Sequence, residues 1–504
     1  MRKSLAVIVA AVAVVQLWLA HRYFGFMTGD DVEVLSEAFR RARGLHYQPW
    51  DVRSLFVPDT VVAPIVWLAA QLGISNTRTL IFASSLPFIA LTSITIVLVY
   101  RLTLRWCSDE RAAMVAVLLF ALHWIPLGFG STVYPRTLAA ACVVAAALIA
   151  DRWPFAAGAL AGIAFTDRFS EIVFVAPLLI TIIKNSDLAT PTSDREATQA
   201  LDRAPFSPTL FVGEKVPKAD EGAALRNPED SSITESSGSF DRPPALRVLR
   251  RLRMTAWLLA GFLISILLTA GVYDWLTWGA PFRSFLNFAH LTLVAPDFAS
   301  RVKYQAPWWY FANLVRWCSP LLLPLLWYAR RSRAIWFVII PLIAFSAIKH
   351  KELRYLQVMI PFLMIAAAIG FASMYRRHQR LAIALVAISV LWNVYGIRYF
   401  ARKSQPAVEA AQWLASNPNV HSVAVSQLWA YGDKLYFGDR IGQADLGTPP
   451  EGLSDPISAD ALALYETDLD VPSRVARIRQ LGYSSVRTFR DDPARAVVVF
   501  MRTK

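Results

Sequence analysis

The chain has little charge for its size: 17% of its 504 residues are Asp, Glu, Lys or Arg, whereas 55% are hydrophobic. Soluble domains usually carry about 25% charged residues. Without that charge, many apolar stretches approach the roughly 20 residues with which a helix spans a hydrocarbon core. These features exclude an ordinary soluble protein and predict an α-helical polytopic membrane protein.

The chain also has few cysteines and lacks the common cofactor motifs. Cys107, Cys142 and Cys318 lie in or beside apolar runs at unrelated spacings, so they support neither a disulfide framework nor a zinc site. There is no G-x-x-x-x-G-K-[ST] loop, no G-x-G-x-x-G after a predicted strand and no H-E-x-x-H. A nucleotide or other soluble cofactor is therefore not implied, and nothing supports a divalent metal site.

Apolar runs with basic flanks divide the chain into about eleven predicted membrane helices. The N-terminal run resembles a secretory signal, but bulky residues from His21 to Phe24 follow it where a cleavage site needs small ones. We therefore predict that it is retained as the first membrane helix. The predicted spans are roughly 4–23, 79–101, 111–130, 134–150, 154–167, 169–184, 254–273, 311–329, 334–349, 356–375 and 380–400.

Basic residues lie at the ends of these spans and do not form one basic face. With the N-terminus in the cytoplasm, the clusters that flank the predicted spans fall on the cytoplasmic side, as the positive-inside rule requires. The net charge of +14 is therefore an orientation signal and no evidence for nucleic acid. An odd number of spans places the C-terminus outside. The clusters are Arg2/Lys3, Arg101/Arg105, Arg152, Lys184, Arg247 to Arg253, Arg330/Arg331/Arg333 and Arg376/Arg377/Arg380.

Two segments differ from this pattern. Residues 186–246 are rich in Ser, Thr, Pro, Asp and Glu and show no periodicity, which predicts a disordered cytoplasmic loop. From residue 403, two amphipathic helices (PAVEAAQWLASN and SRVARIRQLGY) alternate with strand-like runs (VHSVAVS, SSVRTF and AVVVFM). About 100 residues suffice for a small domain. We therefore expect a transmembrane domain at 1–402 and an extracytoplasmic α/β domain at 403–504.

A cluster of ionisable residues stands between two apolar runs, in the string SAIKHKELRYLQVMIPF. The predicted topology places its cations on the outer side, where the positive-inside bias does not explain them. Cations grouped around one carboxylate suit a phosphate-bearing ligand. The alternative is a cluster that marks the membrane edge. We favour a phosphate site with His350, Lys351 and Arg354 as ligands and Glu352 orienting them.

The first outer segment, FGFMTGDDVEVLSEAFRRARG, supplies acidic residues. On a helix that begins there, Asp30, Glu33 and Glu37 share one face. A carboxylate at this place can take the proton from an acceptor hydroxyl, although acids in a first turn also complement a helix dipole. Asp30 is our first candidate for the base and Asp31 the second.

Two other outer features are less specific. Arg168 stands at an outer boundary beside Asp167, either as a phosphate ligand or as half of a self-neutralising pair. Residues 274–310 are rich in Trp, which is typical of a headgroup-level belt, although aromatic rings also stack on sugars.

Together these residues resemble the GT-C-fold mannosyltransferases that use dolichyl- or polyprenyl-phosphate mannose. More narrowly, they resemble the group that builds glycosylphosphatidylinositol anchors and the lumenal half of N-glycan precursors. That group has a His-Lys-Glu motif followed by an Arg and an aromatic, matched by His350–Glu352, Arg354 and Tyr355. Its first lumenal loop has His-Pro-Asp-Glu and a second Glu seven residues after the Asp. Here Thr28–Asp31 departs from that string in three positions, while Glu37 keeps the spacing.

The resemblance covers roughly residues 1–400, in order. The group's Arg-Ser is matched by Arg53 and Ser54, with Trp50 and Asp51 ahead of them, and its Arg-Thr-Leu by Arg136–Leu138. Its pattern of an Asp, an aromatic-Gly turn and an Asn-Phe is matched by Asp274, Trp278, Gly279, Asn287 and Phe288.

The resemblance implies an inverting transfer of mannose from a polyprenyl- or dolichyl-phosphate donor to a glycan or glycolipid acceptor. The enzyme would be a multi-pass protein of a bacterial plasma membrane or of the endoplasmic reticulum, with its active site on the extracytoplasmic or lumenal side. Glu37 and Arg53 would support the site. One alternative is a GT-C transferase for another sugar or for a protein acceptor. A transporter or flippase is a further alternative, which predicts mid-span charges and internal repeats.

Overall fold

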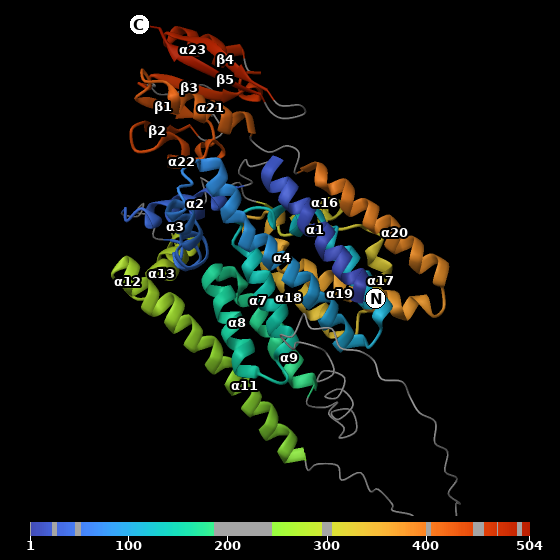
Figure 1. Ribbon diagram of the computed structural model, residues 1–504. Coiled ribbons are helices and arrows are strands. Elements are labelled where there is room, and N and C mark those ends of the chain that lie inside the picture. The colour runs from blue at the N-terminus through green and yellow to red at the C-terminus, as the bar shows by residue number, and fades with distance from the viewer. Residues whose placement is uncertain are drawn as a thin grey trace, which may run out of the picture.

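The computed structural model describes residues 2–22, 28–45, 52–185, 244–294, 305–399, 405–446, 458–470, 472–490 and 496–503. The predicted cytoplasmic loop therefore lies outside the described residues up to residue 243, as do Trp50 and Asp51. In the described part, a bundle of helices carries a five-stranded sheet beyond one of its ends (Figure 1).

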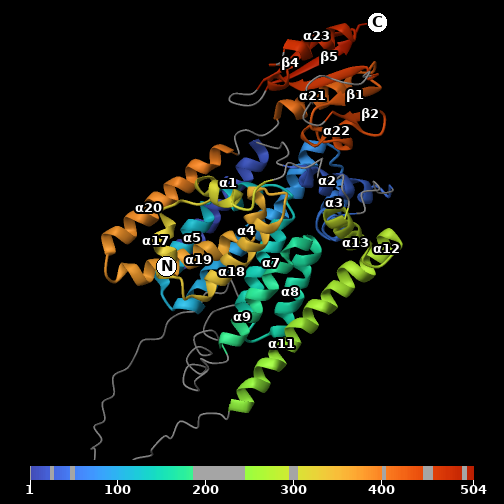
Figure 2. The same cartoon turned by 180° about the vertical axis from the view of Figure 1, so that it is seen from behind.

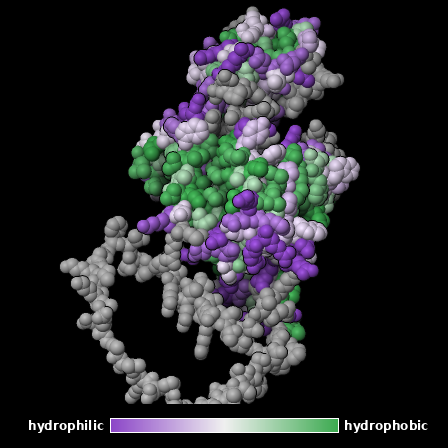
Figure 3. Space-filling view, turned by 90° about the vertical axis from the view of Figure 1, so that its right-hand side faces the viewer, coloured by the Kyte–Doolittle hydropathy of each residue, from purple (hydrophilic) through white to green (hydrophobic). Residues whose placement is uncertain are grey.

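The bundle is built from apolar helices. In the described ranges, four helical segments are long and apolar enough to cross a membrane, and four shorter apolar helices accompany them. An apolar band crosses the bundle between two polar zones, as expected of an integral membrane protein (Figure 3). The helices are α1 (Arg2–Arg22), α4 (Thr77–Cys107), α5 (Glu110–Ala121), α6 (Trp124–Phe129), α7 (Arg136–Ile149), α8 (Pro154–Asp167), α9 (Val175–Asn185), α11 (Pro244–Ile266), α17 (Leu322–Tyr328), α18 (Trp336–Ala347), α19 (Ile360–Tyr375) and α20 (Gln379–Tyr395).

Three predicted spans differ in detail. The span at 111–130 is divided between α5 and α6, because His123 begins α6 as its N-cap. The span at 311–329 is three short helices: α15 (Trp309–Ala312), α16 (Leu314–Trp317) and α17. Cys318 is extended, and Pro320 lacks the N–H that a continuous helix needs. The span at 254–273 is longer than predicted, since α11 continues through η3 (Leu267–Val272) into α12 (Tyr273–Trp278).

Helices α8 and α11 approach each other at small residues. A methyl group on Gly158 would lie 1.9 Å from the carbonyl oxygen of Leu258, and one on Gly261 would lie 2.0 Å from that of Phe155. Such close backbone approach is how helices pack in a membrane, where apolar surface alone gives little driving force.

Gly158→Ala is therefore expected to destabilise the protein by about 1–3 kcal/mol, because the clashing atoms belong to a backbone that cannot move aside easily. Thermal unfolding in detergent would measure this. An unchanged melting temperature would contradict the close packing of α8 on α11.

The five-stranded sheet has the order β2-β1-β3-β5-β4. Strand β1 (Ser422–Val425) runs parallel to β2 (Gly442–Asp445) and β3 (Ala461–Tyr465), whereas β5 (Val497–Arg502) is antiparallel to β3 and β4 (Tyr483–Phe489). The predicted helices α21 (Gln405–Ser416) and α23 (Pro472–Gln480) are present, as are the predicted strands β1, β4 and β5. The small C-terminal α/β unit is therefore confirmed, whereas β2 and β3 were not predicted.

The sheet unit packs on helix α2 (Gly29–Ala42), which lies between it and the bundle in both views (Figures 1 and 2). The contacts come from η8 (Leu428–Tyr431) and α22 (Lys434–Phe437), which connect β1 to β2. Trp429 lies against Gly29, and Arg40 Nη1 is 3.3 Å from Asp439 Oδ1. Helix α2 is thus held from both sides.

Candidate functional site

A cavity of about 270 Å³ opens where α2 meets the end of the bundle that lies nearest the sheet (Figure 1). Its walls come from segments far apart in the chain, including the starts of α7 and η2 (Phe169–Phe174) and the residues before η6 (Leu353–Leu356). Its ionisable lining residues are Asp30, Glu33, Glu37, Arg53, Arg136, Asp167, Arg168, His350, Arg354 and Tyr355.

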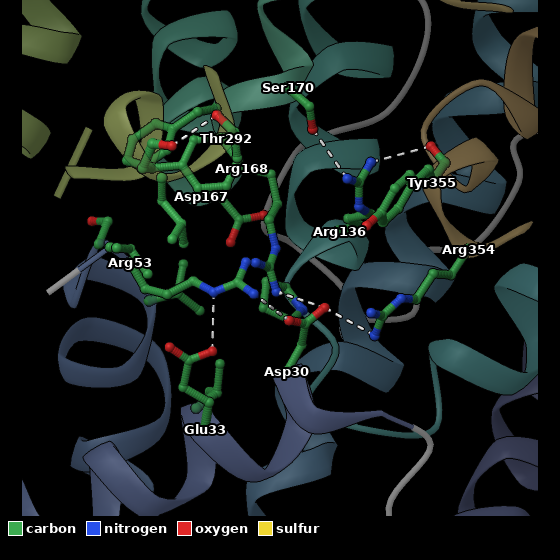
Figure 4. Close-up of a pocket in the computed structure, with 18 of the residues that line it drawn as sticks. Asp30, Glu33, Arg53, Arg136, Asp167, Arg168, Ser170, Thr292, Arg354 and Tyr355 are labelled. Carbon is green, nitrogen blue, oxygen red and sulfur yellow. Dashed lines mark hydrogen bonds and ion pairs between the residues drawn. The ribbon is translucent and has the colours of Figure 1, made fainter. Parts of the chain in front are cut away.

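Asp30 lies among three arginines, as Figure 4 shows. Its Oδ1 is 2.9 Å from Arg53 Nη2, and its Oδ2 is 3.1 Å from Arg168 Nη2 and 3.0 Å from Arg354 Nη1. Burial alone would raise the pKa of Asp30, but the positive charges of Arg168, Arg354 and Arg53 outweigh it and hold that pKa well below its usual range. Asp30 is therefore ionised, and Arg53, Arg168 and Arg354 form what we call the three-arginine site.

Helix α2 explains which acids reach the cavity. The helix begins at Gly29, so that Asp30, Glu33 and Glu37 lie on one face, and all three line the cavity. Asp31 is buried and does not line it. Of the two candidate bases, the structure thus presents Asp30 to the cavity.

Glu33 is less strongly paired than Asp30. Its Oε2 lies 3.1 Å from Arg53 Nε, the one cation within ion-pair distance of it among the described residues. Burial raises the pKa of this carboxyl, and Arg53 only partly offsets that effect. Glu33 is thus a second carboxylate in the same cavity. The sequence predicted this, because a spacing of three residues places Glu33 on the same helix face as Asp30.

The His-Lys-Glu segment (residues 350–354) sends its side chains in two directions. His350 Nε2 is 3.1 Å from Glu352 Oε1, and Arg354 Nε pairs with Glu352 Oε2. Although burial opposes it, Arg354 and His350 lower the pKa of Glu352 to about 2. Glu352 thus orients His350 and Arg354, both of which line the cavity.

Lys351 differs from this arrangement. Its Nζ donates to Gln305 O at 3.0 Å and to Ile348 O, and it does not line the cavity. The other two predicted phosphate ligands, His350 and Arg354, line the cavity, whereas the Lys351 ammonium is bound by backbone carbonyl groups. Lys351 thus joins two loop backbones just behind the site.

Lys351→Ala is expected to lower the free energy of unfolding by about 1–3 kcal/mol, because two carbonyl groups lose their shared donor. The apparent donor KM of the folded variant should stay within about twofold of the original value. Thermal unfolding and donor titration would separate the two effects. A large rise in the apparent donor KM with unchanged stability would instead indicate that Lys351 binds the donor phosphate.

Arg136 holds the wall behind Arg354. It donates to Ser170 Oγ at 3.0 Å and to Tyr355 O at 3.1 Å, pairs with Glu171, and lies 4.6 Å from the centre of the Tyr355 ring. The Arg-Thr-Leu match indicated Arg136, but no sequence signal indicated Glu171 or Ser170. Across the described ranges, no group of three His, Cys, Asp or Glu side chains is placed to hold a metal ion.

Part of the chain matches a known protein family. Residues 242–416 match the model of the Alg9-like mannosyltransferase family. The predicted resemblance to these mannosyltransferases is confirmed. The matched segment includes the His-Lys-Glu segment and ends at residue 416, before the first strand of the sheet; it does not include α2.

Individual relatives are more distant. GPI mannosyltransferase 3 of Yarrowia lipolytica is 29% identical over 166 residues, which is 32% of each chain, so this chain spans about a third of that relative's length. ArnT from Cupriavidus metallidurans has a similar fold, with TM-scores of 0.57 when bound to undecaprenyl phosphate and 0.53 in the apo state. Identity to it is 13%, and the similarity covers 99% of this chain and 98% of ArnT. The fold is therefore the GT-C fold seen in ArnT.

Proposed function

We propose that the protein transfers mannose, with inversion, from a polyprenyl- or dolichyl-phosphate donor to a glycan or glycolipid acceptor outside the cytoplasm. The observation that carries the proposal is the cavity in which the carboxylate of Asp30 meets the three-arginine site. The family match supports mannose as the sugar. Undecaprenyl phosphate bound to ArnT, which has a similar fold, supports a lipid phosphate as the carrier.

The arginines suit the donor phosphate. Arg53, Arg168 and Arg354 are held by different segments, so they surround an anion from several sides. Guanidinium groups bind phosphate oxygens with charge-assisted hydrogen bonds. They also stabilise the negative charge that grows on the phosphate as the bond to the sugar breaks.

Asp30 supplies the opposite half of the reaction. In a single displacement, the acceptor hydroxyl attacks the anomeric carbon from the side opposite the phosphate, which inverts the configuration. Asp30 accepts the proton of that hydroxyl. Glu352 keeps His350 and Arg354 in place, and Glu37 extends the acidic face of α2 along the cavity wall.

The proposed topology has about eleven membrane helices, with the N-terminus in the cytoplasm and the cavity on the extracytoplasmic or lumenal side. The membrane would be a bacterial plasma membrane or the endoplasmic reticulum. The predicted basic clusters support this orientation, since those near Arg105, Arg333 and Arg376 lie at helix ends remote from the cavity. Residues 403–504 would then form an extracytoplasmic domain that covers α2.

Purified protein in nanodiscs, supplied with labelled polyprenyl-phosphate mannose and a membrane extract as acceptor, would test the proposal. We expect label in a glycan or glycolipid, with an anomeric configuration opposite to that of the donor. Transfer from a glucosyl or arabinosyl carrier but not from the mannosyl carrier would favour another GT-C transferase. Movement of the intact carrier across the bilayer without transfer would favour a flippase.

A further inference from the structure

We propose that Asp30 competes internally with the donor phosphate: its carboxylate occupies the three-arginine site until the phosphate displaces it and frees it to act as the base. This inference rests on the proposed function and deepens it, because it gives the site an order of events.

The first support is the number of cations around one small anion. Arg53, Arg168 and Arg354 all lie within 3.1 Å of Asp30, whose side chain is 8% exposed. One carboxylate has two oxygens, whereas each guanidinium has five N–H donors in a planar fork. Glu33 also pairs with Arg53, and Glu352 with Arg354. Among the described residues, however, Asp30 is the acid that all three guanidinium groups contact, so an anion that replaces it meets all three.

The second support is unused donor capacity in one of these side chains. Arg53 Nε and Arg354 Nη1 lie 3.1 Å and 3.0 Å from carboxylate oxygens of Glu33 and Asp30. In the described part of the chain, Arg168 Nε is buried and has no hydrogen-bond acceptor. Buried donors without acceptors are costly, and the tetrahedral oxygens of a phosphate can reach directions that a flat carboxylate cannot.

Electrostatics then forces the exchange. A phosphodiester that enters the three-arginine site brings a negative charge to within a few ångströms of Asp30, in a cavity of low dielectric. Two anions at this separation repel each other strongly, so one must move away from the arginines. The phosphate is tethered by its lipid, whereas the Asp30 side chain lines the cavity and needs only a rotation about its own bonds to leave the arginines.

Displacement from the arginines also makes Asp30 a stronger base. Among three arginines its pKa is held low, so it accepts a proton poorly. Away from them it recovers the proton affinity that a general base needs. The carboxylate therefore becomes an effective base only when a donor is in place.

The cycle balances in atoms and charge. The bond between the anomeric carbon and the phosphate oxygen breaks, the acceptor oxygen forms its bond to that carbon, and the acceptor proton passes to Asp30. The leaving group is a polyprenyl phosphate dianion, which the three arginines hold. When Asp30 loses its proton to solvent, its restored negative charge competes again and helps to expel the product.

Binding of undecaprenyl phosphate to purified protein in nanodiscs tests the exchange. We expect Asp30→Asn to bind it about tenfold or more tightly than the original protein, because the competing charge is gone. Glu33→Gln should tighten binding less, because within the described ranges Glu33 forms its ion pair with Arg53 and not with Arg168 or Arg354. Glu409→Gln removes an exposed acid outside the cavity and should leave the Kd unchanged.

Equal or weaker binding by Asp30→Asn would overturn the exchange. If that variant does not fold, proton uptake by the unaltered protein decides instead, measured calorimetrically at about pH 5 as it binds polyprenyl-phosphate mannose without an acceptor. Uptake is expected, because a displaced Asp30 regains a higher pKa; no uptake would overturn the proposal. Mannose transfer by the same preparation is scored separately, so that failure of the exchange and failure of the proposed function remain distinguishable.

Discussion

Asp30→Asn is expected to slow mannose transfer by about 10²–10⁴-fold, the usual contribution of a positioned general base, while the protein still accumulates in the membrane. The amide keeps the shape of the side chain but cannot accept the acceptor's proton. Steady-state transfer at saturating donor would measure the loss, and Glu409→Gln, which removes an exposed acid outside the cavity, would serve as the matched control.

Asp31→Asn separates the two neighbouring acids. Asp31 is buried and does not line the cavity. Asp31→Asn should therefore lower the yield of folded protein, while the kcat of the molecules that do fold changes little. If Asp31→Asn were inactive and Asp30→Asn active, the general base would be Asp31 and not Asp30. Full activity in both variants would refute acid-base catalysis from this helix.

The acidic face of α2 could be predicted because it depends on local geometry alone. Three- and four-residue spacing aligns Asp30, Glu33 and Glu37 on any helix that begins near Gly29. The arginines around Asp30 could be named singly but not brought together from the sequence. Arg53, Arg168 and Arg354 lie on separate segments, and only the packing of the bundle makes their side chains converge.

Lys351 shows that a motif does not by itself predict the direction in which each of its side chains points. The backbone is extended at Ile348 and at Glu352, so that neighbouring side chains alternate in direction. His350 and Glu352 therefore meet on one side, and Lys351 points to the other, towards Gln305. The 3₁₀ turn that follows brings Arg354 back to the cavity. The motif of charged residues predicted where the site lies, but not which of its side chains line the cavity.

The missed strands have a similar explanation. Strand β3 reads ALALY and is buried throughout, so it shows no alternation of apolar and polar residues. Strand β2 reads GQAD, which lacks β-branched and aromatic residues, and it forms at the sheet edge by pairing with β1. In both, tertiary contacts decide the structure and local propensity does not.

Arg354→Ala should raise the apparent donor KM and also lower kcat. The side chain contacts the ground-state anion site, but negative charge grows on the phosphate as the anomeric bond breaks, so the transition state loses more. Loss of one charged hydrogen bond in a partly dry site should cost about 2–4 kcal/mol, or about thirty- to a thousand-fold in kcat/KM. Arg168→Ala should behave alike, since Arg168 contacts the same oxygen of Asp30.

Arg354→Lys separates the effect of the positive charge from that of the guanidinium shape. It keeps the charge but loses the planar fork that reaches Asp30 and Glu352 together, so its kcat/KM should fall between those of the original protein and the alanine variant. Kinetics with varied polyprenyl-phosphate mannose on purified protein would measure all three variants. Near-normal kcat and KM in both alanine variants would mean that these arginines only neutralise Asp30 and do not hold the donor. The phosphate would then have to bind elsewhere along the cavity, and His350 would be the remaining candidate phosphate ligand of the His-Lys-Glu segment that faces it.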